Sequence, residues 1–198
     1  VLRVDGLLNV QANSIDLGNQ AGDEMQFGSL HFESNGGVEI SENSDMLIVD
    51  VGLGANTGNN VVLTADGNLT LDTNSQIDVS GSATLSSDSV LMRQGSQIDA
   101  TGDIDIQTLT GDVAITSINS DFDVLIVSAQ NIIDGDSGVD DLDIQGFNVT
   151  LTANNGSIGS SEADVFLADS TAGNPNPLEV TVTAAGVNYT ATANNGMI

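Results

Sequence analysis

Apolar and polar residues alternate in short runs through the middle of the chain. Examples are Leu69-Thr70-Leu71, Ile77-Asp78-Val79, Ile104-Asp105-Ile106 and Val113-Ala114-Ile115. Alternation with a period of two places one set of side chains on each face, which predicts β-strands of about 3–5 residues. Asp-Gly, Ser-Gly and Thr-Gly pairs between the runs favour tight turns. None of these runs lies in a stretch with helical spacing, so we expect an all-β fold.

Two phrases in this region repeat each other. Residues 74–81 read NSQIDVSG, and residues 95–102, 21 positions later, read GSQIDATG. Repetition at this period is typical of solenoids, in which equivalent strands of successive coils pair about 4.8 Å apart and the inward Ile, Leu and Val stack into one core. We therefore predict a parallel β-helix of about nine coils, at roughly 20 residues per coil. The alternative is a β-sandwich of Greek-key hairpins, which has no reason to repeat whole phrases.

Outside the regular centre the pattern supports less detailed predictions. Residues 1–20 are expected to form one coil with strands at 8–10 and 15–17, and residues 124–127 a buried strand. The segment 52–60 is predicted to be a Gly/Asn loop, and Pro175 and Pro177 to lie in a loop outside the stack because proline cannot donate to a strand ladder. The phrase TANNG occurs at 152–156 and at 192–196, which suggests a separation of two coils.

The charge of the chain is extreme. It carries 28 acidic residues against two basic ones, for a net charge of −26, and it has no lysine. Such a surface repels nucleic-acid phosphates and anionic membranes, so no nucleic-acid partner is expected. No apolar run reaches the length of a membrane span, so no membrane insertion is expected either. Aromatic residues are only 3% of the chain, which makes a platform for stacking sugars hard to build.

The strongest candidate site is the acidic stretch at 134–143. Closely spaced carboxylates separated by glycines suit the six to eight oxygen ligands of Ca²⁺. The candidate metal ligands are Asp134, Asp136, Asp140, Asp141 and Asp143. The sequence lacks the bidentate Glu of the helix–loop–helix calcium motif and the tandem nonapeptides of calcium-binding β-rolls. The alternative is an acidic surface turn.

No transition-metal site or disulfide framework is expected. The chain has no cysteine, and His31 is its single histidine. The alternation of His31 with Leu30 and Phe32 predicts an outward position rather than a metal ligand.

Several phrases resemble the repeats of filamentous-haemagglutinin-type adhesins and related giant bacterial surface proteins. They are VTLTANNGSIGS, NPLEVTVTAAGVNYTATANNG, LTADGNLTL and SQIDVSG, which together cover most of residues 61–198. The resemblance implies a right-handed parallel β-helix that is secreted or exposed at the cell surface and serves adhesion or forms an extended stalk.

These observations predict residues 1–198 to be a single β-helical repeat domain and a segment of a longer array, because the chain starts at Val1 and stops within a repeated phrase. We expect a structural or adhesive, non-catalytic role outside the cell. The expected partners are neighbouring repeats or subunits that stack end to end, and a host-cell or matrix surface. The alternative is a β-helical enzyme acting on polysaccharides, because hydrolases need only two well-placed carboxylates.

Overall fold

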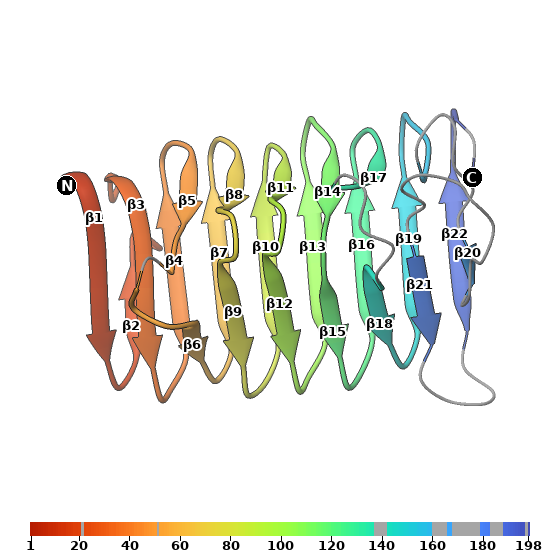
Figure 1. Cartoon of the computed structure of the whole chain (residues 1–198). Coiled ribbons are helices and arrows are strands. Elements are labelled where there is room, and N and C mark those ends of the chain that lie inside the picture. Colours follow the sequence, from red (N-terminus) through yellow and green to blue (C-terminus); the bar gives the residue numbers. More distant parts are fainter. Residues whose placement is uncertain are drawn as a thin grey trace.

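The chain forms a parallel β-solenoid of about seven turns. The computed structural model describes residues 1–20, 22–50, 52–136, 142–159, 166–167, 179–182, 188–196 and 198, and these contain strands but no helix. Successive turns lie side by side from the N-terminus to the C-terminus (Figure 1). The predicted all-β solenoid is thus confirmed, and the β-sandwich is wrong. Among the described residues no helix is long and apolar enough to span a membrane.

Each regular turn contributes one strand to each of three columns. Column 1 contains β2 (Ile15–Leu17), β4 (Val38–Glu42), β7 (Val61–Ala65), β10 (Ala83–Ser87), β13 (Ile104–Thr108), β16 (Val124–Ser128), β19 (Val149–Ala153) and β22 (Tyr189–Ala193). Column 2 contains β5 (Met46–Ile48), β8 (Leu69–Leu71), β11 (Val90–Met92), β14 (Val113–Ile115) and β17 (Ile132–Asp134). Column 3 contains β6 (Asn56–Gly58), β9 (Gln76–Val79), β12 (Gln97–Ala100), β15 (Ile118–Ser120), β18 (Ile144–Gly146) and β21 (Glu179–Val182).

Columns 2 and 3 meet at one long strand near the N-terminus. The strand β3 (Met25–Ser34) pairs with β5 through Leu30 and with β6 through Glu33. On its other side β3 pairs with β1 (Leu2–Ala12). At the opposite end β20 (Phe166–Leu167) pairs with β21.

Equivalent residues of the two repeated phrases pair with each other on adjacent strands. Ile77 pairs directly with Ile98, and Asp78 pairs with Asp99. The corners before these two strands match as well, because Asn74 and Gly95 both adopt positive φ angles, of 60° and 74°. Asn and Gly are the residues that tolerate this left-handed conformation best. The 21-residue period therefore predicts both the pairing and the shape of the corner.

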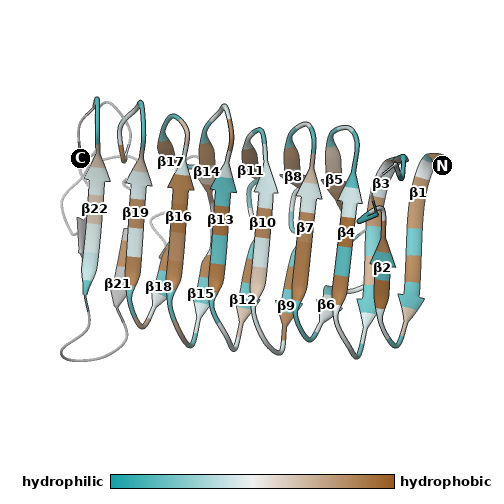
Figure 2. Cartoon of the chain, turned by 180° about the vertical axis from the view of Figure 1, so that it is seen from behind, coloured by the Kyte–Doolittle hydropathy of each residue, from teal (hydrophilic) through white to brown (hydrophobic). Residues whose placement is uncertain are grey.

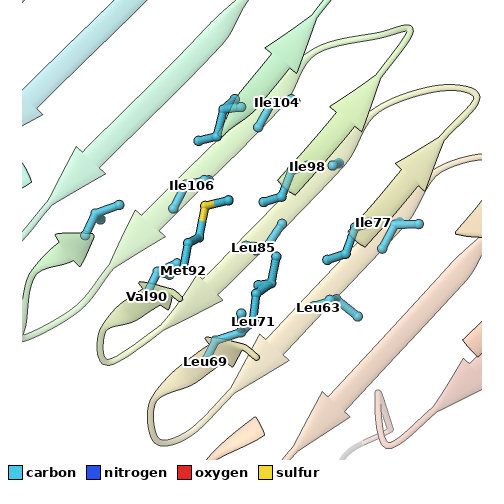
Figure 3. Packing of buried hydrophobic residues seen from close by; sticks show 14 of the residues in the cluster. Leu63, Leu69, Leu71, Ile77, Leu85, Val90, Met92, Ile98, Ile104 and Ile106 are labelled. Carbon is cyan, nitrogen blue, oxygen red and sulfur yellow. The ribbon is translucent and has the colours of Figure 1, made fainter. Parts of the chain in front are cut away.

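The core is a continuous stack of aliphatic side chains. Leu69, Ile77 and Leu85 come from columns 2, 3 and 1, are fully buried, and point into the same interior (Figure 3). Figure 2 shows the expected alternation as bands along β4, whereas β16 is nearly all hydrophobic. Three of the five residues of β16 are buried, while Leu125 faces outward and is 38% exposed. The prediction of a strand at 124–127 is confirmed, but its outer face is not covered.

Turn side chains bind the coils to one another. Between columns 1 and 2, Asp45 Oδ1 accepts a hydrogen bond of 2.8 Å from the Asn68 backbone amide, and Asn131 Oδ1 accepts one of 2.9 Å from Ser157. Between columns 3 and 1, Asp103 Oδ1 accepts from the Asp123 amide at 3.1 Å. Short Asp, Asn and Ser side chains suit this role because they reach neighbouring backbone amides. The bias toward these residues thus has a structural use in the turns.

The number and spacing of coils differ from the prediction. The distance between equivalent column 1 residues varies, and Thr152 pairs directly with Thr192, 40 residues later. The two TANNG phrases therefore lie on adjacent strands of column 1, not two coils apart. This long spacing takes up residues that would otherwise form further turns, which explains seven turns in place of nine. Pro175 and Pro177 lie outside the described residues.

The predicted Gly/Asn loop at 52–60 is partly wrong. Residues 56–58 form β6, in which Asn56 pairs with Ile77 of the next coil. Two of these three residues, Asn56 and Gly58, are of types that are depleted in strands. The extended conformation of β6 follows from pairing with β3 on one side and β9 on the other.

Candidate functional site

A groove runs across the outer face of column 3. It has a volume of about 620 Å³ and is lined by Ser34, Asn35, Thr57, Gly58, Asp78, Val79, Ser80, Asp99, Ala100, Thr101, Asn119 and Asp121. A second hollow of about 390 Å³, nearer the N-terminus, shares Ser34, Asn35 and Thr57 with the first. The two hollows therefore form one polar surface that follows the long axis of the solenoid.

The strand register places the acidic residues on this groove. Ile77 and Val79 of β9 point into the core, so Asp78 between them faces outward. The same holds for Asp99 of β12, and the pairing of β9 with β12 stacks these two carboxylates on neighbouring coils. Thr57 and Asn119 continue the row on the coils before and after.

The groove concentrates negative charge. Burial raises the pKa of Asp78, and the neighbouring Asp99 raises it further. Asp99 accepts a hydrogen bond of 2.5 Å from Gln97 through Oδ2, while its buried Oδ1 has no partner among the described residues. The carboxylate of Asp121 at the end of the groove forms no hydrogen bond or ion pair with the described residues.

No basic side chain neutralises these acids. The chain has two arginines and no lysine. Arg3 pairs with Asp5 at 3.2 Å, and Arg93 pairs with Asp72 at 2.8 Å, both outside the residues that line the groove. The site is therefore an acceptor of cations or of hydrogen-bond donors.

The predicted calcium ligands are only partly described. Asp134 ends β17 and its Oδ1 accepts a hydrogen bond of 2.9 Å from the Asp136 backbone amide. Asp143 is buried, and its backbone oxygen accepts a bond of 2.7 Å from Ile118. Asp140 and Asp141 lie outside the described residues. The described part of the chain contains no group of three acidic or histidine residues arranged to hold a metal, and calcium at this stretch stays a prediction.

His31 is buried, so the predicted outward position does not expose its side chain to solvent. Its Nδ1 lies 3.2 Å from the Val49 carbonyl oxygen and its Nε2 lies 3.3 Å from Glu33 Oε1. Val49 begins the connection from β5 to β6, which is longer than the equivalent corner between β8 and β9. Because both ring nitrogens face acceptors, only the imidazolium form donates to both.

Asn56 completes this buried polar cluster. It occupies the inward position that Ile77 and Ile98 occupy on later coils. Its Oδ1 accepts from the Phe32 amide at 3.0 Å, and its Nδ2 donates to Asp50 Oδ1 at 2.6 Å and to the Gln76 oxygen at 3.0 Å. These bonds fix the corner between β5 and β6 next to the groove.

The acidic groove was not predicted, although a signal for it existed. The repeated phrase places Asp78 over Asp99 as soon as it is read as strand register. Nothing local distinguishes these two residues from the other aspartates of the chain. Their significance comes from the hollow around them.

Comparison with known proteins adds no family to this picture. The chain matches no protein-family model, no curated protein and no solved structure.

Proposed function

We propose that this chain is a structural and adhesive segment of a large secreted or cell-surface protein, of the kind that filamentous-haemagglutinin-type repeats form. The observation that carries the proposal is the elongated, self-stacking architecture. Each coil adds strands to the same columns and side chains to the same core, so length grows by simple addition. The resemblance of the repeated phrases to such adhesins supports the same role.

The first strands support end-to-end assembly. Within the described residues β1 pairs only with β3, which leaves its other edge open. Val1 is 93% exposed and Leu7 is 44% exposed at this end. An open strand edge is a template for pairing with another strand. We propose that neighbouring repeats or subunits cover it in the intact assembly.

The adhesive role is tested by retention of coated beads under flow. Beads that carry the chain are compared with beads that carry an unrelated protein of similar size and charge, on layers of cells, extracellular matrix and bacterial polysaccharide. Retention well above the control on at least one surface is expected. Retention equal to the control on every surface would contradict the adhesive role.

The groove supports one alternative, a carbohydrate-active enzyme. Asp78 and Asp99 stand on strands about 4.8 Å apart, near the carboxyl separation of about 5–5.5 Å in retaining glycosidases. The raised pKa of Asp78 is a property of a general acid. Incubation with a panel of polysaccharides, followed by an assay for new reducing ends, tests this alternative. Activity that D78N and D99N each abolish would favour the enzyme, and absence of product would favour the adhesive segment.

A further inference from the structure

Two exposed phenylalanines lie together beside the acidic groove. Phe122 is 59% exposed and Phe147 is 43% exposed. They belong to turns of successive coils, and the Phe147 amide donates a hydrogen bond of 2.6 Å to the Phe122 oxygen. We call this pair the Phe corner. Asp121, which lines the groove, directly precedes Phe122.

The Phe corner has no evident structural purpose. The two phenylalanines near the N-terminus, Phe27 and Phe32, are buried in the core. In the regular coils the equivalent turn contains Gly81 and Gly102, joined by a backbone bond of 2.8 Å. The turn therefore forms without an aromatic side chain. Large apolar side chains exposed side by side commonly mark interaction surfaces.

The charge around the Phe corner defines what it can bind. Asp121 and Asp123 flank Phe122, and both are exposed. Asp123 Oδ1 accepts a bond of 2.7 Å from Asn148 Nδ2, while the carboxylate of Asp121 has no partner among the described residues. The groove adds Asp99 on the preceding coil and Asp78 on the coil before that. An aromatic face framed by unneutralised carboxylates matches a flat cation.

We propose that the Phe corner and the groove together bind an extended, arginine-bearing peptide segment of a partner protein. A guanidinium group stacks on a phenylalanine face and pairs with a neighbouring carboxylate, which combines a cation–π contact with charge-assisted hydrogen bonds. The rest of the peptide follows the groove past Asp99 and Asp78. This inference rests on the adhesive half of the proposed function and names the chemistry of its partner.

Other occupants fit the observations less well. A second copy of this chain brings a net charge of −26 and only two arginines, both already paired with aspartates. A neutral glycan could stack on the rings but would leave the repulsion between Asp78 and Asp99 in place. A basic peptide supplies both the aromatic contact and the missing positive charge.

The first test measures binding of a fluorescent oligo-arginine peptide by anisotropy. The double variant F122A/F147A is compared with L91A/L109A, which removes two exposed leucines elsewhere on the solenoid. One exposed cation–π contact corresponds to about twofold to fivefold in Kd. We expect F122A/F147A to lose about tenfold in affinity and the leucine control to stay within twofold. Equal affinities for all three proteins would overturn the proposal.

The second test distinguishes peptide binding at the groove from general attraction to the acidic surface. D78N/D99N removes a stacked pair of outward carboxylates from column 3, and D16N/E39Q removes an equivalent stacked pair from column 1. We expect D78N/D99N to weaken oligo-arginine binding several-fold more than D16N/E39Q. Equal losses would mean that the whole surface attracts the peptide, which would overturn a defined site. Tighter binding of a neutral oligosaccharide, sensitive to F122A/F147A, would overturn the peptide in favour of a glycan.

The two proposals fail in different ways. In one outcome the beads are retained on a surface, but none of the four double variants changes oligo-arginine binding. This result would support the adhesive role and contradict the peptide site. Beads that are never retained, combined with specific peptide binding at the Phe corner, would preserve the site and remove the adhesive role.

Discussion

The coils from β7 to β15 and the coil that contains β3 to β6 use different means to stay in register. In the regular coils, most inward positions are aliphatic and the turns are short, so Ile77, Ile98 and Ile118 stack directly. In the earlier coil, the buried side chains of Glu42 and Asn56 accept hydrogen bonds from the backbone amides of Phe27 and Phe32. The difference indicates that a solenoid tolerates an irregular coil when side chains replace the missing backbone partners.

Glu42 shows this replacement clearly. It stands at the inward end of β4, where later coils have Ala65 and Ser87. Its Oε1 accepts a bond of 3.0 Å from the Phe27 amide and one of 2.9 Å from Ser44, while its Oε2 is buried without a partner among the described residues. Burial raises the pKa of Glu42 above its usual range.

The largest expected effect on stability comes from placing a buried amide, as at Asn56, in a regular coil. I98N places an amide in the regular coil without the partners that Asn56 has. It removes a fully buried aliphatic side chain and adds an unsatisfied polar group, so the free energy of unfolding should fall by about 4 kcal/mol or more. Urea denaturation measures this loss. The control I98V should lose only about 1 kcal/mol, and an I98N variant as stable as I98V would contradict the comparison.

The reverse change removes the buried amide of Asn56 from the irregular coil. N56A leaves the Phe32 amide and the Gln76 oxygen without their partner, which should cost about 2–3 kcal/mol. N56I restores the aliphatic column but not the hydrogen bonds, so it should also be less stable than the natural chain. If N56I were as stable as the natural chain in urea, apolar packing alone would account for the register of both coils.

A third prediction concerns the pH dependence of the irregular coil. Because burial raises the folded pKa of Glu42 above the ordinary value of 4.5, the stability that it contributes as a neutral group is complete below pH 4.5. This stability is lost as the pH rises through the raised folded pKa. E42Q cannot ionise at this position. The change in its Tm between pH 4 and pH 8 should therefore be smaller than that of the natural chain, by roughly 2–4 °C. The exposed E39Q should keep the pH dependence of the natural chain; identical curves for E42Q and E39Q would contradict the role of Glu42.

The smallest expected effect concerns calcium at Asp134, Asp136, Asp140, Asp141 and Asp143. An ion that binds only the folded chain raises its Tm, by about 1–2 °C when its concentration equals the Kd. Thermal melts in EDTA, Ca²⁺ and Mg²⁺ measure the shift. A rise with Ca²⁺ that D134N/D136N removes and D16N/E39Q does not would place the ion at this stretch. The same melt in all three conditions would leave these residues as an acidic turn.

Local pattern predicted much of the regular region. Alternation identified β8, β9 and β13, and the 21-residue phrase predicted the pairing of Ile77 with Ile98. These predictions succeeded because coils of nearly constant length place like residues over like. Alternation did not predict the burial of His31, because it describes the two faces of a strand and not what another segment lays over it.

The candidate sites depend more on tertiary structure. Phe122 and Phe147 are 25 residues apart, a spacing that no repeated phrase reveals, and they become neighbours because the intervening residues form one coil of the solenoid. The calcium stretch was visible as a cluster in the sequence, yet its described residues do not belong to a group that could hold a metal ion.

The sequence by itself determined the strand faces, the solenoid architecture, the register of the regular coils and the acidity of the surface. These properties follow from the period of alternation, the period of the phrases and the composition. Tertiary structure alone decided that Asn-Thr-Gly forms β6, that His31 is buried, that residues 40 apart pair in column 1, and that two phenylalanines adjoin an acidic groove. Coil length varies at these places, so the partner of each residue is set by the hydrogen bonds and packing offered by the coil beside it.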